Sequence, residues 1–232
     1  MRKPSLLSLC VLFLLFVPLT ATTEAIYYFE NFEGTVGNEW SNTSTDTTPG
    51  TAQHPVDDFL GQFGNDTVSL TLNNLSAHTE ITVSFDLYII RTWDGTPAMT
   101  MGNEILDVDV SDGQTLLHTG FSNMELHGNP WQCYPDGYPD GNNPSRTDAA
   151  ENNTLGFMSP YGHIMDSVYS FYNTNSFTFA HSSSSIQLNF SGSNLQSLPD
   201  ESWGIDNILV TPEPATVLLL GLGGLSIVRK RR

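Results

Sequence analysis

Lysine is nearly missing from this chain of 232 residues, and arginine is scarce. Between residues 26 and 211 there is no lysine, and Arg91 and Arg146 alone stand against 23 acidic residues, a formal charge of −21. Nucleic-acid-binding proteins neutralise phosphates with lysine and arginine, so this composition excludes a nucleic-acid partner. Calcium, neutral sugars and cationic surfaces remain as partners. The alternative is an acidic surface that contacts solvent alone.

Cysteine is almost absent as well. Cys10 lies in an apolar run near the N-terminus, and Cys133 is the second and last cysteine of the chain. One cysteine outside that run excludes an internal disulfide in the rest of the chain, so stability has to come from a hydrophobic core or a bound metal. Cys133 is either a small, partly buried side chain or a thiol that pairs between two chains.

Motifs of common catalytic sites are absent too. The sequence has no Gly-x-Ser-x-Gly elbow, no phosphate-binding loop and no histidine pair at zinc spacing. The stretch NEILDVDV (103–110) faintly resembles the paired-acid strand of laminarinase-type glycoside hydrolases. On a strand, however, Asp107 and Asp109 share one face and Glu104 points the opposite way, which departs from the Glu-x-Asp-x-x-Glu pattern of that family. We therefore expect no enzyme.

The N-terminus has the pattern of a secretory signal peptide. Arg2 and Lys3 precede an apolar run at residues 6–19, and Thr23 and Ala25 stand where signal peptidase requires small residues. We expect a signal helix in residues 1–25 that signal peptidase removes, and an exported domain over residues 26–211.

Alternation of apolar and polar residues predicts the fold of that domain. It is found at residues 67–75, 80–90, 175–180, 185–190 and 203–210, and clusters of Asn, Gly, Asp and Pro separate these runs. SDGQ (111–114) adds the signal of an Asp-Gly hairpin. No amphipathic helix is evident. The pattern predicts an all-β domain, an antiparallel β-sandwich of jelly-roll type.

Residues 122–165 do not follow this pattern. They are rich in Pro, Gly, Asn and Asp, and they carry Trp131, Tyr134 and Tyr138 among acidic residues. Aromatic side chains on a loop at the rim of a sandwich stack on sugar rings in many binding sites, and loops often hold the functional residues. The alternative is that these aromatics pin the loop to the sandwich.

The C-terminus contains three consecutive signals. A Pro-Glu-Pro triplet comes first, a small and apolar run follows at residues 215–228, and basic residues end the chain: Pro212, Glu213, Pro214, then Arg229, Lys230, Arg231 and Arg232. Fourteen apolar residues are short for a spanning helix, which needs about 20. The basic end would stay cytoplasmic. Physical reasoning alone thus predicts a marginal C-terminal transmembrane anchor.

In this order, the three signals resemble the PEP-CTERM sorting signal of Gram-negative and related bacteria. The resemblance covers residues 211–232. It implies that exosortase, a membrane-embedded transpeptidase-like enzyme, cuts near the triplet after the helix has held the chain in the membrane. It also implies a cell-surface or extracellular destination, because the family accompanies exopolysaccharide and biofilm production. An ordinary tail anchor is the alternative.

The domain itself resembles β-jelly-roll domains of such exported proteins in SFDLYIIRTWDG (84–95), HTGFSN (118–123), IQLNFSGSNLQ (186–196) and DESWGIDNILV (200–210). Carbohydrate-binding relatives often hold a structural calcium between an early Glu and a late Asp. That resemblance implies calcium ligands here at Glu30, Glu33 and Asp206. Asp206 lies in an otherwise apolar strand, where an unpaired carboxylate would be costly. Its alternative role is to bond backbone amides at a strand bend.

Three hypotheses follow for the exported domain. The first is a non-catalytic structural or interaction protein of the extracellular polymer layer. The second is a carbohydrate-binding module, assisted by calcium, that binds extracellular polysaccharide through the loop aromatics and the concave sheet. The third is a glycoside hydrolase.

Overall fold

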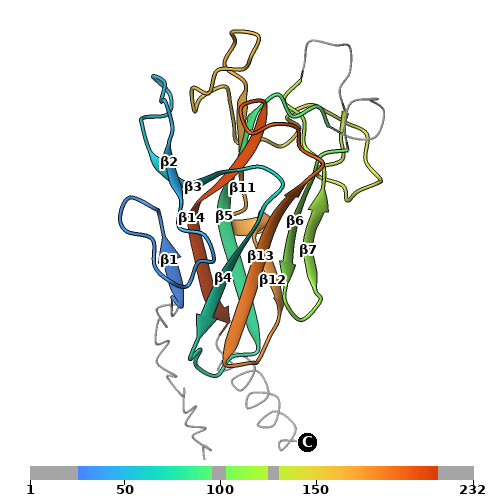
Figure 1. Ribbon diagram of the computed structural model, residues 1–232. Helices are drawn as coiled ribbons and strands as arrows, with labels where there is room; N and C mark the ends of the chain where they lie inside the picture. The colour runs from blue at the N-terminus through green and yellow to red at the C-terminus, as the bar shows by residue number, and fades with distance from the viewer. Residues whose placement is uncertain (1–25, 96–102, 125–130, 214–232) are drawn as a thin grey trace, which may run out of the picture.

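The computed structural model describes residues 26–95, 103–124 and 131–213 (Figure 1), and within them the chain is built from strands. In chain order the elements are β1 (Tyr28–Glu30), β2 (Thr45–Thr47), β3 (Asp58–Phe63), β4 (Thr67–Asn73), β5 (Glu80–Arg91), β6 (Ile105–Val110), β7 (Thr115–Thr119), β8 (Trp131–Gln132), β9 (Asn143–Pro144), β10 (Glu151–Asn152), β11 (Asp166–Ser170), the 3-10 helix η1 (Asn173–Asn175), β12 (Phe177–Ala180), β13 (Ser185–Ser193) and β14 (Glu201–Glu213).

The smaller of the two main sheets follows the alternation of its sequence closely. Its antiparallel strands lie in the order β4-β13-β6-β7. Every second residue of β13 is buried, including Ile186, Leu188 and Phe190, and the residues between them are partly exposed. The predicted Asp-Gly hairpin joins β6 to β7 and is confirmed. Gly113 adopts a φ of +98° there, which a residue without Cβ accepts easily.

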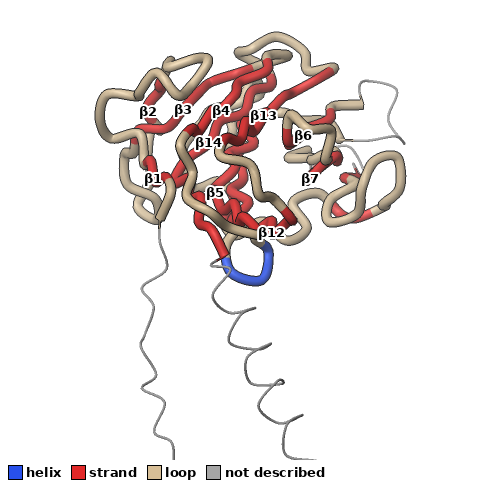
Figure 2. The backbone as a smooth tube through the Cα atoms, turned by 90° about the horizontal axis from the view of Figure 1, so that it is seen from below, coloured by secondary structure: helices blue, strands red, loops and turns tan. Residues whose placement is uncertain are grey.

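The larger sheet is built around β5 and β14. Its order is β10-β11-β5-β14-β3-β2, with β1 pairing to β14 and β12 to β5. β5 and β14 pair from Glu201 opposite Arg91 to Glu213 opposite Glu80, with one irregularity between Asp206 and Leu209. β11 and β12 pair with β5 one after the other, and η1 loops out of the sheet between them (Figure 2).

The strand order identifies the sandwich as a jelly roll. The chain passes from β3 in the large sheet to β4 in the small one and returns to β5. It then crosses to the hairpin β6–β7 in the small sheet, returns to β11 and β12, and crosses once more to β13 before β14. The order β11-β5-β14-β3 thereby faces β4-β13-β6-β7, which is the double Greek key arrangement. The prediction of an all-β antiparallel sandwich is confirmed.

The main core fills the space between the sheets with aromatic rings. The ring of Phe85 lies 5.0 Å from that of Phe171 and 5.3 Å from that of Phe190. Trp93 and Trp203 are fully buried, and each indole donates a hydrogen bond of 2.8 Å to a backbone carbonyl. Burial of this apolar surface is the main stabilising contribution in a domain without an internal disulfide. Cys133 is fully buried, so its thiol is out of reach of a second chain.

A second, smaller core covers the outer face of the large sheet. It consists of Phe59, Tyr88, Ile90, Leu155, Phe157 and Val168. Leu155 and Phe157 belong to the predicted loop, and the carboxylate of Asp166 holds that loop by accepting hydrogen bonds from the N–H groups of residues 155, 156 and 157 at 3.0–3.1 Å. Part of residues 122–165 is therefore packed against the sheet.

The described chain begins and ends at the same pole of the sandwich (Figure 1). β1 pairs with β14, and the N–H of Tyr27 donates to the carbonyl of Val210 at 2.9 Å. β14 continues to Glu213, two residues past the boundary predicted at residue 211. The predicted signal helix and the predicted C-terminal transmembrane helix fall outside the described residues. Within the described residues, no helix is long and apolar enough to cross a membrane.

Candidate functional site

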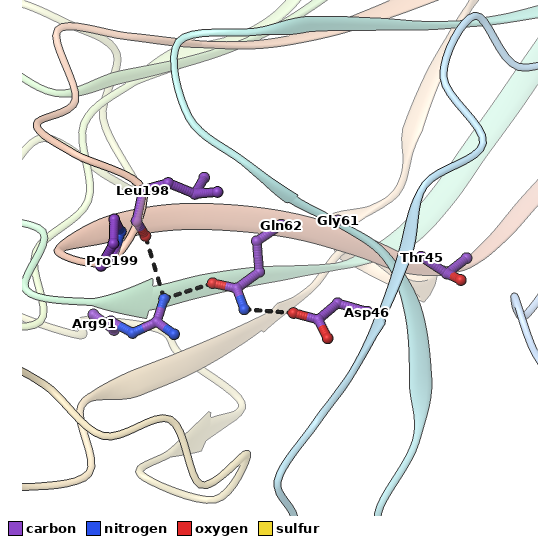
Figure 3. A pocket seen from close by; sticks show the side chains of 7 residues that line it. All are labelled: Thr45, Asp46, Gly61, Gln62, Arg91, Leu198 and Pro199. Atoms are coloured by element: carbon purple, nitrogen blue, oxygen red, sulfur yellow. Dashed lines mark hydrogen bonds between the residues drawn. The ribbon is translucent and has the colours of Figure 1, made fainter.

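A polar pocket of about 310 Å³ opens where β2, β3 and the end of β5 meet the loop before β14 (Figure 3). Its lining combines hydrogen-bonding side chains with a small apolar wall: Thr45, Asp46, Gly61, Gln62, Arg91, Leu198 and Pro199.

A chain of hydrogen bonds crosses this pocket. Arg91 Nη1 donates to Gln62 Oε1 at 2.5 Å and to the carbonyl of Leu198 at 3.4 Å, and Gln62 Nε2 donates to Asp46 Oδ2 at 2.6 Å (Figure 3). The guanidinium carbon of Arg91 also lies 5.3 Å from the ring centre of Phe157 in the second core. Arg91 is thus held from two sides, in a backbone conformation with φ of +68°.

The chemistry of the pocket suits a neutral, hydroxyl-rich ligand. A guanidinium, an amide and a carboxylate together offer donors and acceptors at fixed positions, and these groups hydrogen-bond hydroxyls readily. Ligand sites in general combine a few such polar groups with an apolar wall, and Leu198 and Pro199 form that wall here.

Sequence reasoning did not identify this pocket. Gln62 lies in DFLGQF, a short run without clear alternation, and Asp46 lies in a polar stretch of turn residues. The one available signal was Arg91, one of two arginines in residues 26–211. In so acidic a region, a lone arginine at the end of a strand is an unusual residue.

Several acidic side chains, among them Asp206, lie on the outer face of the large sheet, which loops cover. Asp206 is 1% exposed. Tyr88 Oη donates to its Oδ2 at 2.9 Å, and the N–H of Asn207 donates to its Oδ1 at 2.6 Å. Asn207 has a φ of +50°, at the irregularity of β14. This is the arrangement of the alternative interpretation, a carboxylate that bonds a backbone amide at a strand bend.

Burial, together with the carboxylates of Asp57 and Asp86, raises the pKa of Asp206 to about 7, although the hydrogen bonds from Asn207 and Tyr88 act to lower it. Burial also raises the pKa of Asp57 to about 6, with an additional contribution from Glu33. The carboxyl groups of Glu33, Asp57 and Asp206 influence one another: the pKa of Glu33 is lowered, while those of Asp57 and Asp206 are raised.

The calcium ligands implied by the resemblance are not brought together as one group. Glu30 Oε1 accepts from the N–H groups of Asn31 and Phe32 at the end of β1. Glu33 Oε1 accepts from the N–H of Asp58, and Asp206 uses both oxygens as described above. Within the described ranges, Glu30, Glu33 and Asp206 do not form a set whose ligand atoms lie within 4.8 Å of one another.

The three loop aromatics have different surroundings. Tyr134 is half-buried and packs on Phe121, Tyr169 and Phe171, with ring centres 5.1–5.8 Å apart. Its ring pins the loop to the core, as in the alternative interpretation. Tyr138 lies edge-on to His118 of β7 at 5.6 Å and is partly exposed. Trp131 belongs to β8, and its side chain falls outside the described part.

Two of the three acids considered for hydrolase chemistry lie on the outer face of the small sheet. Asp107 and Asp109 are both partly exposed on β6, and Asp107 pairs with His118 on β7. Glu104 precedes β6 and is fully buried. The expected split of these acids between two faces is confirmed.

The sorting triplet begins inside the sheet. Pro212 is buried opposite Ile81, and Glu213 pairs with Glu80 as the last residue of β14. Pro214 and the basic residues Arg229, Lys230, Arg231 and Arg232 lie outside the described residues.

Comparison with known proteins identifies this terminal segment. Residues 210–232 match the model of the PEP-CTERM protein-sorting motif, which confirms the resemblance seen in the sequence. The motif marks an exported protein that is processed at the membrane and displayed on the cell surface. No curated protein matches the chain.

Solved structures similar to the chain include the following two, both of low sequence identity. One is the CBM22-1 xylan-binding domain from Paenibacillus barcinonensis Xyn10C, at a TM-score of 0.37 and 10% identity over 84% of this chain and 99% of that chain. Another is the infectious bursal disease virus Gt strain, at a TM-score of 0.29 and 14% identity over 81% of this chain and 32% of that chain. TM-scores this low carry no functional argument.

Proposed function

We propose that the domain is a non-catalytic component of the extracellular polymer layer, displayed at the cell surface after exosortase has processed its tail. The observation that carries this proposal is the sorting motif at residues 210–232, which begins within β14, the last strand of a folded jelly roll. An acidic surface with almost no basic residues keeps such a domain soluble and hydrated among polymers.

The test of the sorting step is a substitution in the triplet. Glu213→Ala should leave the chain at its unprocessed size in the membrane fraction, because the recognition triplet is broken. Glu80→Ala is the matched control, since Glu80 is the exposed residue opposite Glu213 in the sheet. Processing of Glu213→Ala to normal size would contradict exosortase processing at this triplet.

The basic end has a separate prediction. Deletion of residues 229–232 should weaken retention in the membrane before processing, because these residues would hold the C-terminus in the cytoplasm. Fractionation of cells that lack the processing enzyme measures this directly. Unchanged retention would count against the topology.

Carbohydrate binding is the second candidate, and the pocket at Gln62 and Arg91 favours it. Its guanidinium, amide and carboxylate match the hydroxyl groups of a neutral sugar. The purified full chain should then sediment with the extracellular polysaccharide of the producing cell. Gln62→Ala should abolish that binding, while Asp109→Asn, on the opposite sheet, should leave it intact.

The variant Trp131→Ala tests whether the pocket or the loop is the surface that binds the sugar. Loss of binding with Trp131→Ala and not with Gln62→Ala would assign the sugar to the loop. No sedimentation of the unmodified chain, with calcium or with chelator, would leave the structural role alone. A glycoside hydrolase requires polysaccharide cleavage that Asp107→Asn removes.

A further inference from the structure

Three acidic side chains meet at the pole of the sandwich opposite to the chain ends. Asp94 follows β5, Glu104 precedes β6, and Glu201 begins β14. One carboxylate oxygen from each lies within 4.8 Å of the other two. Glu104 and Glu201 are both 0% exposed. Acids from three separate strand ends, two of them wholly buried, are not an ordinary solvated surface.

Glu104 has an oxygen that no described group satisfies. Its Oε2 accepts from the N–H of Gly95 at 2.8 Å, while its Oε1 is buried without a hydrogen-bond partner among the described residues. Buried polar atoms nearly always have a partner, and a carboxylate oxygen without one is especially costly. A ligand beside Oε1 would remove this cost.

Gln196 fixes the geometry of the other two acids. Its Nε2 donates to Asp94 Oδ2 and to Glu201 Oε1, both at 3.2 Å, and its N–H donates to Glu201 Oε2 at 2.6 Å. One neutral amide thus holds two carboxylates close together and leaves their negative charge in place. The loop that contains Gln196 continues to Leu198 and Pro199, the apolar wall of the pocket.

Basic side chains are scarce in the domain that contains this cluster. Residues 26–211 contain two basic residues apart from histidine, Arg91 and Arg146. Arg91 lies opposite Glu201 in the strand register, but its guanidinium bonds Gln62, Ser202 and the carbonyl of Leu198 instead. Burial and then the neighbouring acids raise the pKa of Glu104 to about 8, and burial raises that of Glu201 to about 7.

We propose that Asp94, Glu104 and Glu201 bind one calcium ion. Their donors are all carboxylate oxygens, which hard divalent cations prefer, and calcium tolerates an irregular set completed by carbonyls and water better than magnesium does. The ion supplies the positive charge that the sequence lacks. It joins the end of β5 and the start of β14 in one sheet to the start of β6 in the other. This site is distinct from the set Glu30, Glu33 and Asp206.

Calorimetric titration of the full chain with calcium chloride tests the proposal. The chain is purified in a nonionic detergent and freed of metal with chelator. We expect one equivalent to bind and the melting temperature to rise with calcium concentration. Glu104→Gln and Glu201→Gln should each weaken calcium binding by at least about tenfold. Loss of a residue that only supports a metal ligand already weakens metal binding by about tenfold or more, and these two residues are direct ligands in the proposal.

Two controls place the site. Glu80→Gln removes an exposed carboxylate at the opposite pole, and Asp206→Asn removes the buried acid of the other predicted set. Both should bind calcium like the unmodified chain. In chelator, Glu104→Gln should melt at or above the temperature of the unmodified chain, because glutamine matches glutamate in size and carries no charge, so that repulsion among the acids is reduced. This comparison separates loss of a ligand from loss of the fold.

Several results would overturn the proposal. One is the absence of calcium binding by the unmodified chain. A second is binding that survives both Glu104→Gln and Glu201→Gln, or that Asp206→Asn abolishes. Equal affinity for magnesium would overturn the assignment to calcium.

Discussion

The outer faces of the two sheets are built from similar strands but have opposite surroundings. On the small sheet, the outward residues of β4, β6 and β13 are polar and partly exposed, among them Thr71, Asp109 and Asn189. On the large sheet, loops cover the outward residues of β5, and Tyr88 and Ile90 become a second core. The same two-residue alternation along the strands therefore gives an outer face that contacts solvent in the small sheet and one that is buried in the large sheet.

This difference shows that a covering loop changes the chemistry of a sheet face. Asp109 is partly exposed on the small sheet, whereas Asp206 is buried on the large sheet and its pKa is raised to about 7. Both are aspartates on strands. The contrast predicts that substitutions on the covered face cost more, and change more with pH, than matched substitutions on the wet face.

The largest effect is expected from Phe59→Ala. Phe59 is fully buried in the second core, and truncation of a buried phenylalanine costs about 3–5 kcal/mol of unfolding free energy. Thr71→Ala, on the wet face of the small sheet, should change stability by less than about 0.5 kcal/mol. Urea unfolding of both variants measures the difference. Equal losses would show that the second core contributes no packing energy.

A smaller loss is expected from Asp166→Asn. The carboxylate of Asp166 accepts three N–H groups of the covering loop, and an amide offers one oxygen in place of two. We expect a loss of about 2 kcal/mol. Proteolysis within residues 153–165 should also become faster, because the loop is released. Asp109→Asn is the matched control; the same sensitivity in it would contradict the role of Asp166.

The next effect is a dependence of stability on pH. Asp206 faces Asp57, Asp86 and Tyr88, and its pKa and that of Asp57 are raised in the folded state. The folded state therefore binds protons that the unfolded state releases above about pH 4. These two acids should therefore stabilise the fold most below about pH 4, and stability should fall by about 1–2 kcal/mol as the pH rises from there to about 7.

Asp206→Asn checks that assignment, because asparagine does not titrate. Melting temperatures between pH 5 and pH 8 should decrease less in this variant than in the unmodified chain. Asp109→Asn should keep the original slope. A slope unchanged by Asp206→Asn would assign the pH dependence to other acids.

The smallest effect concerns the wet face alone. Asn189 Oδ1 accepts from Ser69 Oγ and Gln187 Nε2, both at 2.8 Å, on the partly exposed surface of the small sheet. Asn189→Ala should cost about 1 kcal/mol or less, because water replaces these bonds. Thermal unfolding measures it. A loss comparable to that of Phe59→Ala would remove the distinction between the two faces.

The strands that face solvent on one side were predictable from sequence, because their polar residues keep the period visible. The strands β4, β5 and β13 begin at the residues where the alternation predicts a strand to start. β3 was missed since DFLGQF is buried on both faces in the structure and shows no clear period. The acid in the apolar strand was correctly singled out at Asp206. Its partners Asp57 and Tyr88 were not predicted, because they are far from Asp206 in the sequence and are brought to it by loops and cross-strand pairing.

The pocket and the three-acid cluster were not predicted for the same reason, because their residues come together in the folded structure and not in the sequence. Gln62, Arg91 and Leu198 lie far apart in the chain, and jelly-roll topology alone brings them together. The sorting motif is the opposite case, since it is read as a linear sequence at one end of the chain and needs no tertiary contact to be recognised.

β14 leads directly into the sorting segment, and this has a mechanical consequence. A tether attached beyond Glu213 pulls along the axis of a strand that lies between β5 and β3. The hydrogen bonds to both neighbours run across that axis, so they bear the load together as in a shear joint and do not open one by one. Flow past the cell would then detach the domain at a high force or not at all, and force spectroscopy between the C-terminal end of β14 and an attachment point at the opposite pole of the sandwich would measure that strength.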